Sequence, residues 1–496
     1  MPRDPRSEVN LAADFDAQPS AELRGAAFRI VILGDFSARS ARGGAVNTVP
    51  LARRRVRRVD RDDLDAAIAA IAPELRLTLD PAEPPVVIRF SALDDFHPDK
   101  LVERLPLFQQ LRALRDQVDA SGRGSAQSSV PSRPARPPRT ESAALGLSSG
   151  SLLDRIIDSD PNAADSSQGI RGLAPQDELT EFVDRVVRPH TVREASQEQR
   201  DLKAKVDDVI TATMRVLLHH PDFQALEALW RGVDFLVRRL DTSETLHVLV
   251  VDVSKAEVSA DLGSSDLETT GLHRFLTEVL GSRSSLLVGA YTFGPDDVPL
   301  LGRLATLGRM AGAPWLAAAD PRLAGASSFS GDADPDDWEV PLPPDWETLR
   351  RSRDASFLSL ALPRFILREP YGKRTDPCSF PFEEMPAGAP EHESFLWGNG
   401  AVLCAFAIGD SVAADEPPAT QATVENFPLY VATVDGEATA TPCTEALITH
   451  RAVAHMLDRG LTPLASARDG DSILISRLQS VALPPRPLSI PTSSPT

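Results

Sequence analysis

A stretch of thirty residues that cannot form a hydrophobic core divides this chain into two parts. Residues 121–150 contain eight Ser, four Pro and four Gly, and almost no large apolar side chains. Such a segment cannot bury enough apolar surface to offset the conformational entropy that it would lose on ordering, so we predict a flexible linker. The division gives a domain at 21–120, a helical arm at 151–195 and a larger domain at 196–482. The Pro- and Ser-rich end, 483–496, is predicted to be a disordered tail.

Composition and charge exclude several classes of protein. The 496 residues carry 52 Lys and Arg against 71 Asp and Glu, and this formal net charge of −19 argues against nucleic-acid binding. Cys378, Cys404 and Cys443 lack the spacing of a disulfide framework or a zinc site. The sequence has no apolar run of about 18 residues and no signal-peptide pattern at its start. We therefore expect a cytoplasmic chain without membrane insertion.

Hydrophobic patterns in the smaller part predict strands and helices in alternation. Apolar runs at 28–33 and 86–90 predict strands, and helical spacing of apolar residues predicts helices at 64–71 and after Pro98. The apolar face of the helix after Pro98 consists of Leu101, Leu105, Phe108, Leu111 and Leu114. This order of elements describes a small α/β unit.

The larger part opens with helices and continues as a mixture of strands and helices. Two apolar stripes at helical spacing run from Leu202 to Leu218 and from Phe223 to Leu240. A nearly continuous apolar run at 246–253 predicts a strand that is covered on both faces. Further predicted strands are 286–290, 357–362, 365–367 and 401–408, and a further predicted helix is 272–280. The expected fold class is mixed α/β, with two such parts joined by a disordered linker.

One acidic cluster lies where α/β enzymes place metal ligands. Asp94, Asp95, His97 and Asp99 stand between a predicted strand and a predicted helix. A metal-dependent hydrolase built on Asp94, His97 and Asp99 is therefore one hypothesis. The favoured interpretation is that these residues cap the helix that begins at Pro98 and stabilise its positive end.

Two other polar groups have mainly structural interpretations. His219, His220 and Asp222 mark the junction between two predicted helices. Arg364 and Arg368 lie on one side of a predicted strand, where they could bind a substrate. We favour an interpretation of both arginines as partners of buried carboxylates at a domain or subunit contact.

The remaining sequence gives little support for catalysis. A dense basic run from Arg53 to Arg61 is interpreted as a solvated or intersubunit face. The sequence contains no phosphate-binding loop, nucleophile elbow or zinc-protease motif. We therefore predict no catalytic residue, no metal ligand and no cofactor, and an assembly component fits at least as well as an enzyme.

Motifs in both parts follow the order of one known family. In the larger part they are LLHHPDFQALEALWRGVDFLV (217–237), LVGAYTF (287–293), GAPWLAAADPRL (312–323), LALPRFILREPYG (360–372), FPFEE (380–384), FLWGNGA (395–401) and CTEALITHRAVAHMLDRGLTPL (443–464). In the smaller part they are FRIVILGDFSAR (28–39), RVDRDDLDAAIAAIAPEL (58–75) and IRFSALDDFHPDKLVERLPLFQQLRALRD (88–116). The two parts resemble the large and the small subunit of the contractile sheath of bacterial type VI secretion systems.

The resemblance implies a natural fusion of two subunits that form an obligate heterodimer in the family. It implies a non-enzymatic protein whose partners are other sheath subunits, an inner tube and a baseplate, and which acts by mechanical contraction. Fusion makes physical sense because a flexible linker holds two partners at an effective concentration of about millimolar. The predicted contacts between the halves or between subunits are Phe223, Leu226, Trp230, Arg364, Arg368 and Tyr371.

The resemblance also implies a disassembly partner. In the family, a hexameric ATPase grips a short helix at the N-terminus of the large subunit. The segment SLLDRIID (151–158) resembles that helix, and its apolar face consists of Leu152, Leu153, Ile156 and Ile157. An exposed apolar face suits a partner's groove. The alternative is a short helix docked on its own domain.

Two departures from the family pattern leave a second function open. The family's large subunit continues beyond the segment that corresponds to 451–479, into a region with the strand that links neighbouring heterodimers. This sequence instead ends in LPPRPLSIPTSSPT (483–496), and Ala290 stands where the family has Asp. A C-terminally shortened chain could act as a non-polymerising cap, adaptor or regulator of a sheath.

Overall fold

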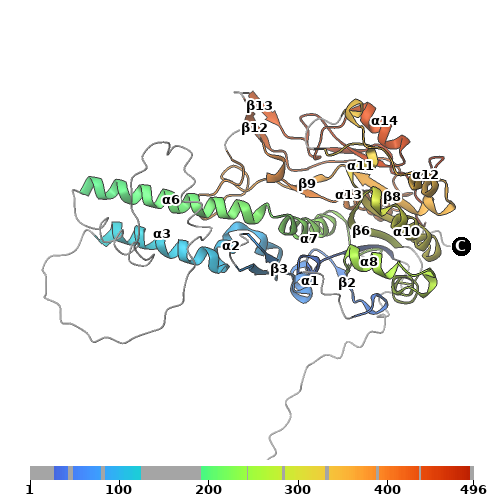
Figure 1. Cartoon of the computed structure of the whole chain (residues 1–496), viewed down its shortest axis with the longest axis horizontal. Helices are drawn as coiled ribbons and strands as arrows, with labels where there is room; N and C mark the ends of the chain where they lie inside the picture. Colours follow the sequence, from blue (N-terminus) through green and yellow to red (C-terminus); the bar gives the residue numbers. More distant parts are fainter. Residues whose placement is uncertain are drawn as a thin grey trace, which may run out of the picture.

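The computed structural model describes residues 27–42, 49–79, 84–124, 192–242, 244–281, 285–329, 334–386, 390–434 and 437–491. Helices and strands are mixed along both parts of the chain, which confirms the predicted α/β class (Figure 1). None of the helices in these ranges is both long and apolar enough to cross a membrane.

A nine-stranded sheet forms the centre of the molecule, in the order β11-β15-β14-β8-β7-β6-β1-β5-β2. Its strands are β1 (Phe28–Gly34), β2 (Val56–Val59), β5 (Leu246–Asp252), β6 (Ser285–Phe293), β7 (Trp315–Ala319), β8 (Leu358–Leu362), β11 (Ala422–Val424), β14 (Thr462–Ser466) and β15 (Ile473–Ile475). The six strands from β5 to β14 are parallel. Antiparallel pairs complete the two ends of the sheet, β2 with β5 and β15 with both β14 and β11.

Strand β1 comes from the smaller part of the chain but lies between two strands of the larger part. Ile30 stands opposite Val248 of β5 and Leu286 of β6. All seven residues of β1 are buried, as expected for a parallel strand covered on both faces. The first strand of the smaller part therefore completes the sheet of the larger part, a pairing that the order of elements does not predict.

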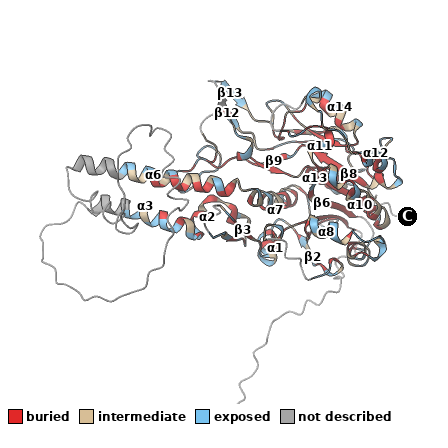
Figure 2. Cartoon of the chain, in the orientation of Figure 1, coloured by how far each residue is buried: buried red, intermediate tan, exposed pale blue. Residues whose placement is uncertain are grey.

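Helices cover both faces of this sheet. They are α7 (Pro221–Arg239) and α13 (Gly400–Ala413) on one face, and α8 (Lys255–Asp261), α9 (Gly271–Arg274) and α10 (Val298–Ala311) on the other. Ile30 and Ile32 of β1 belong to the first hydrophobic core, while Val31 and Leu33 belong to the second. Figure 2 shows the buried residues concentrated in the sheet and on the inner sides of these helices.

Helix α13 overturns one prediction. The sequence predicts a strand at 401–408, and this prediction is wrong because these residues lie inside α13. The side chain of Asn399 starts the helix by accepting a hydrogen bond of 2.9 Å from the backbone N–H of Ala401. The helix is apolar on nearly all sides because it packs between the sheet and α7. Periodicity alone does not distinguish such a buried helix from a buried strand.

Two long helices, one from each part, extend side by side from the sheet (Figure 1). They are α3 (Pro106–Gly124) and α6 (Val192–Leu218), and Arg115 Nε lies 2.7 Å from Asp207 Oδ1 between them. The single helix predicted after Pro98 is divided, because α2 (Pro98–Arg104) stops before Pro106. Helix α3 includes the first four residues of the predicted linker, and the rest of that linker lies outside the described residues.

The remaining elements flank the central sheet. They are α1 (Leu64–Ile71), α11 (Pro321–Ala324), α12 (Pro344–Arg351), α14 (His450–Asp458), β3 (Glu74–Leu77), β4 (Val86–Arg89), β9 (Phe365–Arg368), β10 (Leu396–Gly398), β12 (Val431–Val434) and β13 (Glu437–Ala440). Within the described residues, β3 with β4, β9 with β10 and β12 with β13 form separate two-stranded sheets.

The end of the chain differs from the predicted disordered tail. The backbone N–H of Leu483 donates to the carbonyl of Arg350 at 2.7 Å, and that of Ser489 donates to the carbonyl of Ser356 at 2.9 Å. The side chain of Leu488 is buried. Residues 483–491 therefore pack against α12 and the segment after it, because their apolar side chains and backbone groups find partners there despite the many prolines.

Candidate functional site at the interface between the two parts

An ion-pair network joins the two parts beyond the carboxyl ends of β1 and β5. Arg39 and Arg54 come from the smaller part, and Asp252 and Glu257 come from the larger part. Arg39 Nη2 lies 2.8 Å and Arg54 Nη2 lies 2.6 Å from the two carboxylate oxygens of Glu257. Arg39 also pairs with Asp252, and Arg54 Nη1 donates to the Asp252 carbonyl at 2.8 Å. The two arginines are about nine-tenths buried, so water screens these pairs only weakly.

Glu257 is held in place by local structure as well as by the arginines. It is the third helical residue of α8, and it forms a capping box with Ser254, whose hydroxyl accepts from the Glu257 N–H. Burial alone would raise the pKa of Glu257. The hydrogen bonds from Arg54, from the Ser254 N–H and from Arg39 outweigh burial and lower the pKa from its usual 4.5 to about 2.

This lowered pKa predicts a pH-dependent contribution to stability. Because the folded-state pKa lies below the unfolded value, the Glu257 carboxylate stabilises the fold above pH 4.5, and this stabilisation is lost as the pH falls toward 2. We expect Glu257→Gln to lower the urea midpoint at pH 7, and we expect the difference from wild type to shrink as the pH falls from 5 to 3. The matched control is Glu347→Gln, whose partner Arg351 is exposed on the same helix. Equal effects of the two substitutions at pH 7 would contradict this account.

Aromatic side chains form the second contact between the parts. The rings of Phe36 and Trp230 lie 4.8 Å apart, and Trp230 Nε1 donates to the carbonyl of Phe36 at 3.2 Å. Phe223 packs on Phe90 and Phe96, with ring centroids 6.1 Å and 5.6 Å away. All five side chains belong to one hydrophobic core, together with the buried Leu226. Helix α7 therefore packs its apolar stripe against the smaller part as well as against the sheet.

A buried ionic cluster lies behind this aromatic contact. Arg368 of β9 lies between two carboxylates, with Nε 2.9 Å from Glu227 and Nη1 2.8 Å from Glu384. Arg231 pairs with Glu227 at 2.7 Å and donates to the hydroxyl of Tyr371 at 2.9 Å. Both carboxylates are fully buried. Burial opposes ionisation of Glu384, but Arg368, His219 and the backbone N–H of Tyr371 together outweigh burial and lower the pKa of that carboxyl.

The smaller part touches this ionic cluster through the start of α2. The ring of His97 meets the ring of Tyr371 edge-on, with centroids 5.0 Å apart. The carboxylate of Asp99 accepts hydrogen bonds from the backbone N–H of Ser379 at 2.8 Å and from its hydroxyl at 2.9 Å. The contact between the parts therefore extends from the network around Glu257 to the loop that follows β9.

Arg368 is the last residue of β9 and Arg364 directly precedes this strand, and the surroundings of the two side chains differ. Arg364 pairs with Glu445 and is about half exposed, whereas Arg368 is buried between two carboxylates. Both arginines have carboxylate partners within their own part of the chain.

Two families of known proteins match the sequence of this chain. Residues 200–482, more than half of the chain, match the family described as EvpB/VC_A0108, tail sheath N-terminal domain (VipB). The chain belongs to this tail sheath family. Residues 1–122 match the family described as type VI secretion system, VipA, VC_A0107 or Hcp2. The type VI secretion system sheath protein TssC1 of Pseudomonas aeruginosa is 29% identical over 336 residues, which cover 62% of this chain and 67% of the relative.

These matches confirm a fusion of sheath subunits. The VipA match covers the smaller part of the chain and the VipB match covers most of the larger part. The chain is therefore a structural component of the type VI secretion sheath, and other sheath subunits are its partners. The cap or adaptor function and the hydrolase function are not favoured by these matches.

The acidic cluster of the hydrolase hypothesis serves the fold of this sheath protein. Asp95 accepts from the Ser91 N–H at 2.6 Å and pairs with Arg104. His97, rather than a carboxylate, caps α2 by accepting from the Asp99 N–H at 3.2 Å. Within the described ranges, no three His, Cys, Asp or Glu side chains form a group that could hold a metal ion.

The same cap occurs a second time. His220 precedes Pro221 and Asp222, and its Nδ1 accepts from the Asp222 N–H at 3.2 Å at the start of α7. The neighbouring His219 Nε2 lies 3.3 Å from a carboxylate oxygen of Glu384. These residues therefore have the junction role that the sequence indicates, with a His-Pro-Asp segment at each of the two helix starts.

The sequence does not predict some of these contacts, and other predicted contact residues lie outside the described residues. The four residues of the network around Glu257 are not predicted, although a Ser-x-x-Glu capping signal at 254–257 and an Asp at the end of β5 are visible in the sequence. Their partners, Arg39 and Arg54, are more than 190 residues away. The candidate ATPase-binding residues Leu152, Leu153, Ile156 and Ile157 lie outside the residues that the structure describes.

Proposed function

We propose that the two sheath-subunit parts of this chain pair within one molecule and act together as one building unit of a contractile sheath. The observation that carries this proposal is the position of β1, which pairs with β5 on one side and β6 on the other. A strand in the middle of a sheet is difficult to exchange, because both neighbouring ladders must open. The network around Glu257 and the Phe36–Trp230 contact support the same pairing.

The proposed mechanism is mechanical rather than catalytic. The unit would rotate as a rigid block between two subunit arrangements, with the energy difference stored in the interfaces between units. Two hydrophobic cores that share one sheet suit a block that transmits force without deforming. We propose the cytoplasm as its compartment, and an inner tube, a baseplate and a hexameric disassembly ATPase as further partners. The proposed contact for the ATPase is the face formed by Leu152, Leu153, Ile156 and Ile157.

Electron microscopy of the purified chain tests this proposal. The full chain is imaged by negative stain alone and after coexpression with full-length sheath subunits and the tube protein. We expect the chain in tubular assemblies, with its two parts in a ratio of one to one because they are one polypeptide. Absence of the chain from the sheath, tube and baseplate fractions alike would contradict the proposal. A control variant with Arg468→Glu, an exposed residue, checks that a single surface charge does not decide the result.

A further inference from the structure

Three polar side chains form a row across the amino-terminal end of the central sheet. Arg29 of β1 stands opposite His247 of β5 on one side and opposite Ser285 of β6 on the other. Side chains alternate along a strand, so the row lies on the face of Val31, which α8, α9 and α10 cover. The three residues are buried, with exposed fractions of 5%, 6% and 3%. The row therefore joins the smaller part to the larger part below the surface.

Each side chain of this row has a buried polar atom without a hydrogen-bond partner among the described residues. These atoms are Arg29 Nε, His247 Nδ1 and Ser285 Oγ. Arg29 is held through a different nitrogen, because its Nη1 donates to the carbonyl of Leu280, just after the helical turns that begin with α9. Nearly all buried polar groups in folded proteins bind to protein, water or an ion. Three adjacent exceptions therefore indicate a binding site.

The electrostatic surroundings of the row are positive. Burial, Arg58 of β2 and Arg29 all lower the pKa of His247. Burial also lowers the pKa of Arg29, and no carboxylate among the described residues opposes this effect. The carboxylates that neutralise Arg39 in the network around Glu257 lie at the opposite, carboxyl-terminal end of the same strands. The row therefore combines hydrogen-bond donors with positive charge, which is the environment that an anion requires.

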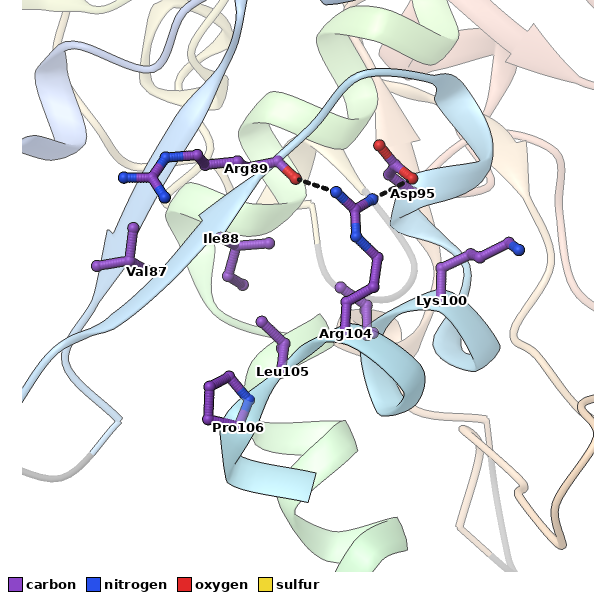
Figure 3. A pocket seen from close by; sticks show the side chains of 9 residues that line it. Val87, Ile88, Arg89, Asp95, Lys100, Arg104, Leu105 and Pro106 are labelled. Atoms are coloured by element: carbon purple, nitrogen blue, oxygen red, sulfur yellow. Dashed lines mark hydrogen bonds and ion pairs between the residues drawn. The ribbon is translucent and has the colours of Figure 1, made fainter. Parts of the chain in front are cut away.

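Another basic region of the smaller part lacks this property. A cavity of about 330 Å³ lies between β4 and α2, and Figure 3 shows Arg104 reaching from α2 toward the carbonyl of Arg89 and the carboxylate of Asp95. Arg89 Nε lies 2.8 Å from a carboxylate oxygen of Glu74. Both arginines of this cavity have carboxylate partners, so the cavity does not require an added anion.

We propose that a small inorganic anion of the size of chloride binds to Arg29 Nε, between His247 and Ser285. A guanidinium and a hydroxyl donate hydrogen bonds, and an imidazole donates from Nδ1 in one tautomer and when protonated, so all three side chains can donate to one acceptor. Neighbouring strands are about 4.8 Å apart, which brings both flanking side chains near an anion on Nε.

The burial of the site determines the class of ligand. The three polar atoms are shielded from solvent, which favours a small ion over a carboxylate side chain of a partner protein. The anion supplies a counter-charge to Arg29 exactly where β1 of the smaller part pairs with β5 and β6 of the larger part. Binding of the anion therefore stabilises the pairing of the two parts.

Thermal unfolding of the full chain tests this site, with sodium chloride replacing sodium gluconate at constant ionic strength. We expect the Tm to rise by about 2–4 °C between 1 and about 100 mM chloride, because the anion binds the folded state. The rise should be larger at pH 6 than at pH 8, because a bound anion favours the charged form of His247. Arg29→Met is expected to abolish the rise, and His247→Gln is expected to remove its pH dependence.

Ser285→Ala keeps the test decisive if Arg29→Met does not fold. Because the Ser285 hydroxyl has no partner among the described residues, we expect this variant to have the wild-type Tm in gluconate and at most half of the wild-type rise in chloride. The matched control is Ser359→Ala on β8, whose buried hydroxyl lies 3.1 Å from that of Thr462. This control should lower the Tm in both salts and leave the chloride response unchanged.

Two results overturn the proposal. One is a wild-type Tm that does not respond to chloride, as expected if water alone satisfies the three polar atoms. The other is an equal response of the wild type, Arg29→Met and Ser285→Ala, which would place the effect of chloride elsewhere on the molecule. Either result leaves the proposed function intact, because these measurements use the single chain and require no sheath.

Discussion

Replacing Arg368 by methionine is expected to lower the free energy of unfolding by about 3–5 kcal/mol, because it leaves two buried carboxylates without their shared partner. Glu227 and Glu384 are both fully buried and lie within 2.9 Å of the guanidinium nitrogens. Methionine fills a similar volume, so the loss measures the charge rather than a cavity. Urea unfolding of the purified chain, followed by tryptophan fluorescence, measures the change.

The neighbouring Arg364 gives a matched control for this substitution. It lies on the loop before the same strand and pairs with Glu445, but its side chain is about half exposed. The Glu445 carboxylate is buried, but removal of the half-exposed Arg364 side chain opens that carboxylate to water, so we expect Arg364→Met to lower the urea midpoint less than Arg368→Met does. Similar losses from the two substitutions would show that the buried cluster has no special role in stability.

Replacing Trp230 by alanine is expected to lower the free energy of unfolding by about 3–5 kcal/mol and to loosen the smaller part in particular. The substitution removes the ring that packs on Phe36 and the hydrogen bond from Nε1 to the Phe36 carbonyl. Hydrogen exchange should therefore rise in β1 and in the segment after it. Native-state exchange followed by mass spectrometry measures this local change.

Trp315→Ala is the control for the effect on the smaller part. Trp315 is also fully buried, but it belongs to β7 and to the hydrophobic core on the other face of the sheet. We expect a comparable loss of global stability, with increased exchange centred on β7 and α10. The same exchange pattern from both tryptophan substitutions would contradict the assignment of Trp230 to the contact between the parts.

Local sequence signals predict most elements of this fold but not their pairing. Strands β1 and β5 are predicted by nearly continuous apolar runs, since each is covered on both faces. The two strands pair in one sheet although they lie more than 200 positions apart in the sequence, and no local pattern predicts such a pairing. Helix α13 is mistaken for a strand because its surroundings, rather than its own amphipathic pattern, decide its conformation.

The same distinction applies to the interface. The positions of Arg364 and Arg368 along the chain predict carboxylate partners, and Arg368 has two of them. Glu384 ends the FPFEE motif but lies in an irregular segment whose position depends on the whole fold, so no local pattern predicts its pairing with Arg368. Arg54 lies within a basic run whose composition predicts a solvated or intersubunit face, yet its side chain is buried against Glu257. A run of basic residues therefore does not indicate which of its side chains pairs with a distant carboxylate.

Cleavage of the linker tests most directly the claim that both sheath parts pair within one molecule. A protease site is placed within residues 125–150, the purified monomeric chain is cut, and the products are separated by size-exclusion chromatography over a range of concentrations. The account predicts that the two fragments elute together at the volume of the uncut 53.5 kDa chain, because β1 remains between β5 and β6. Fragments that separate after complete cleavage, each still folded, would contradict it.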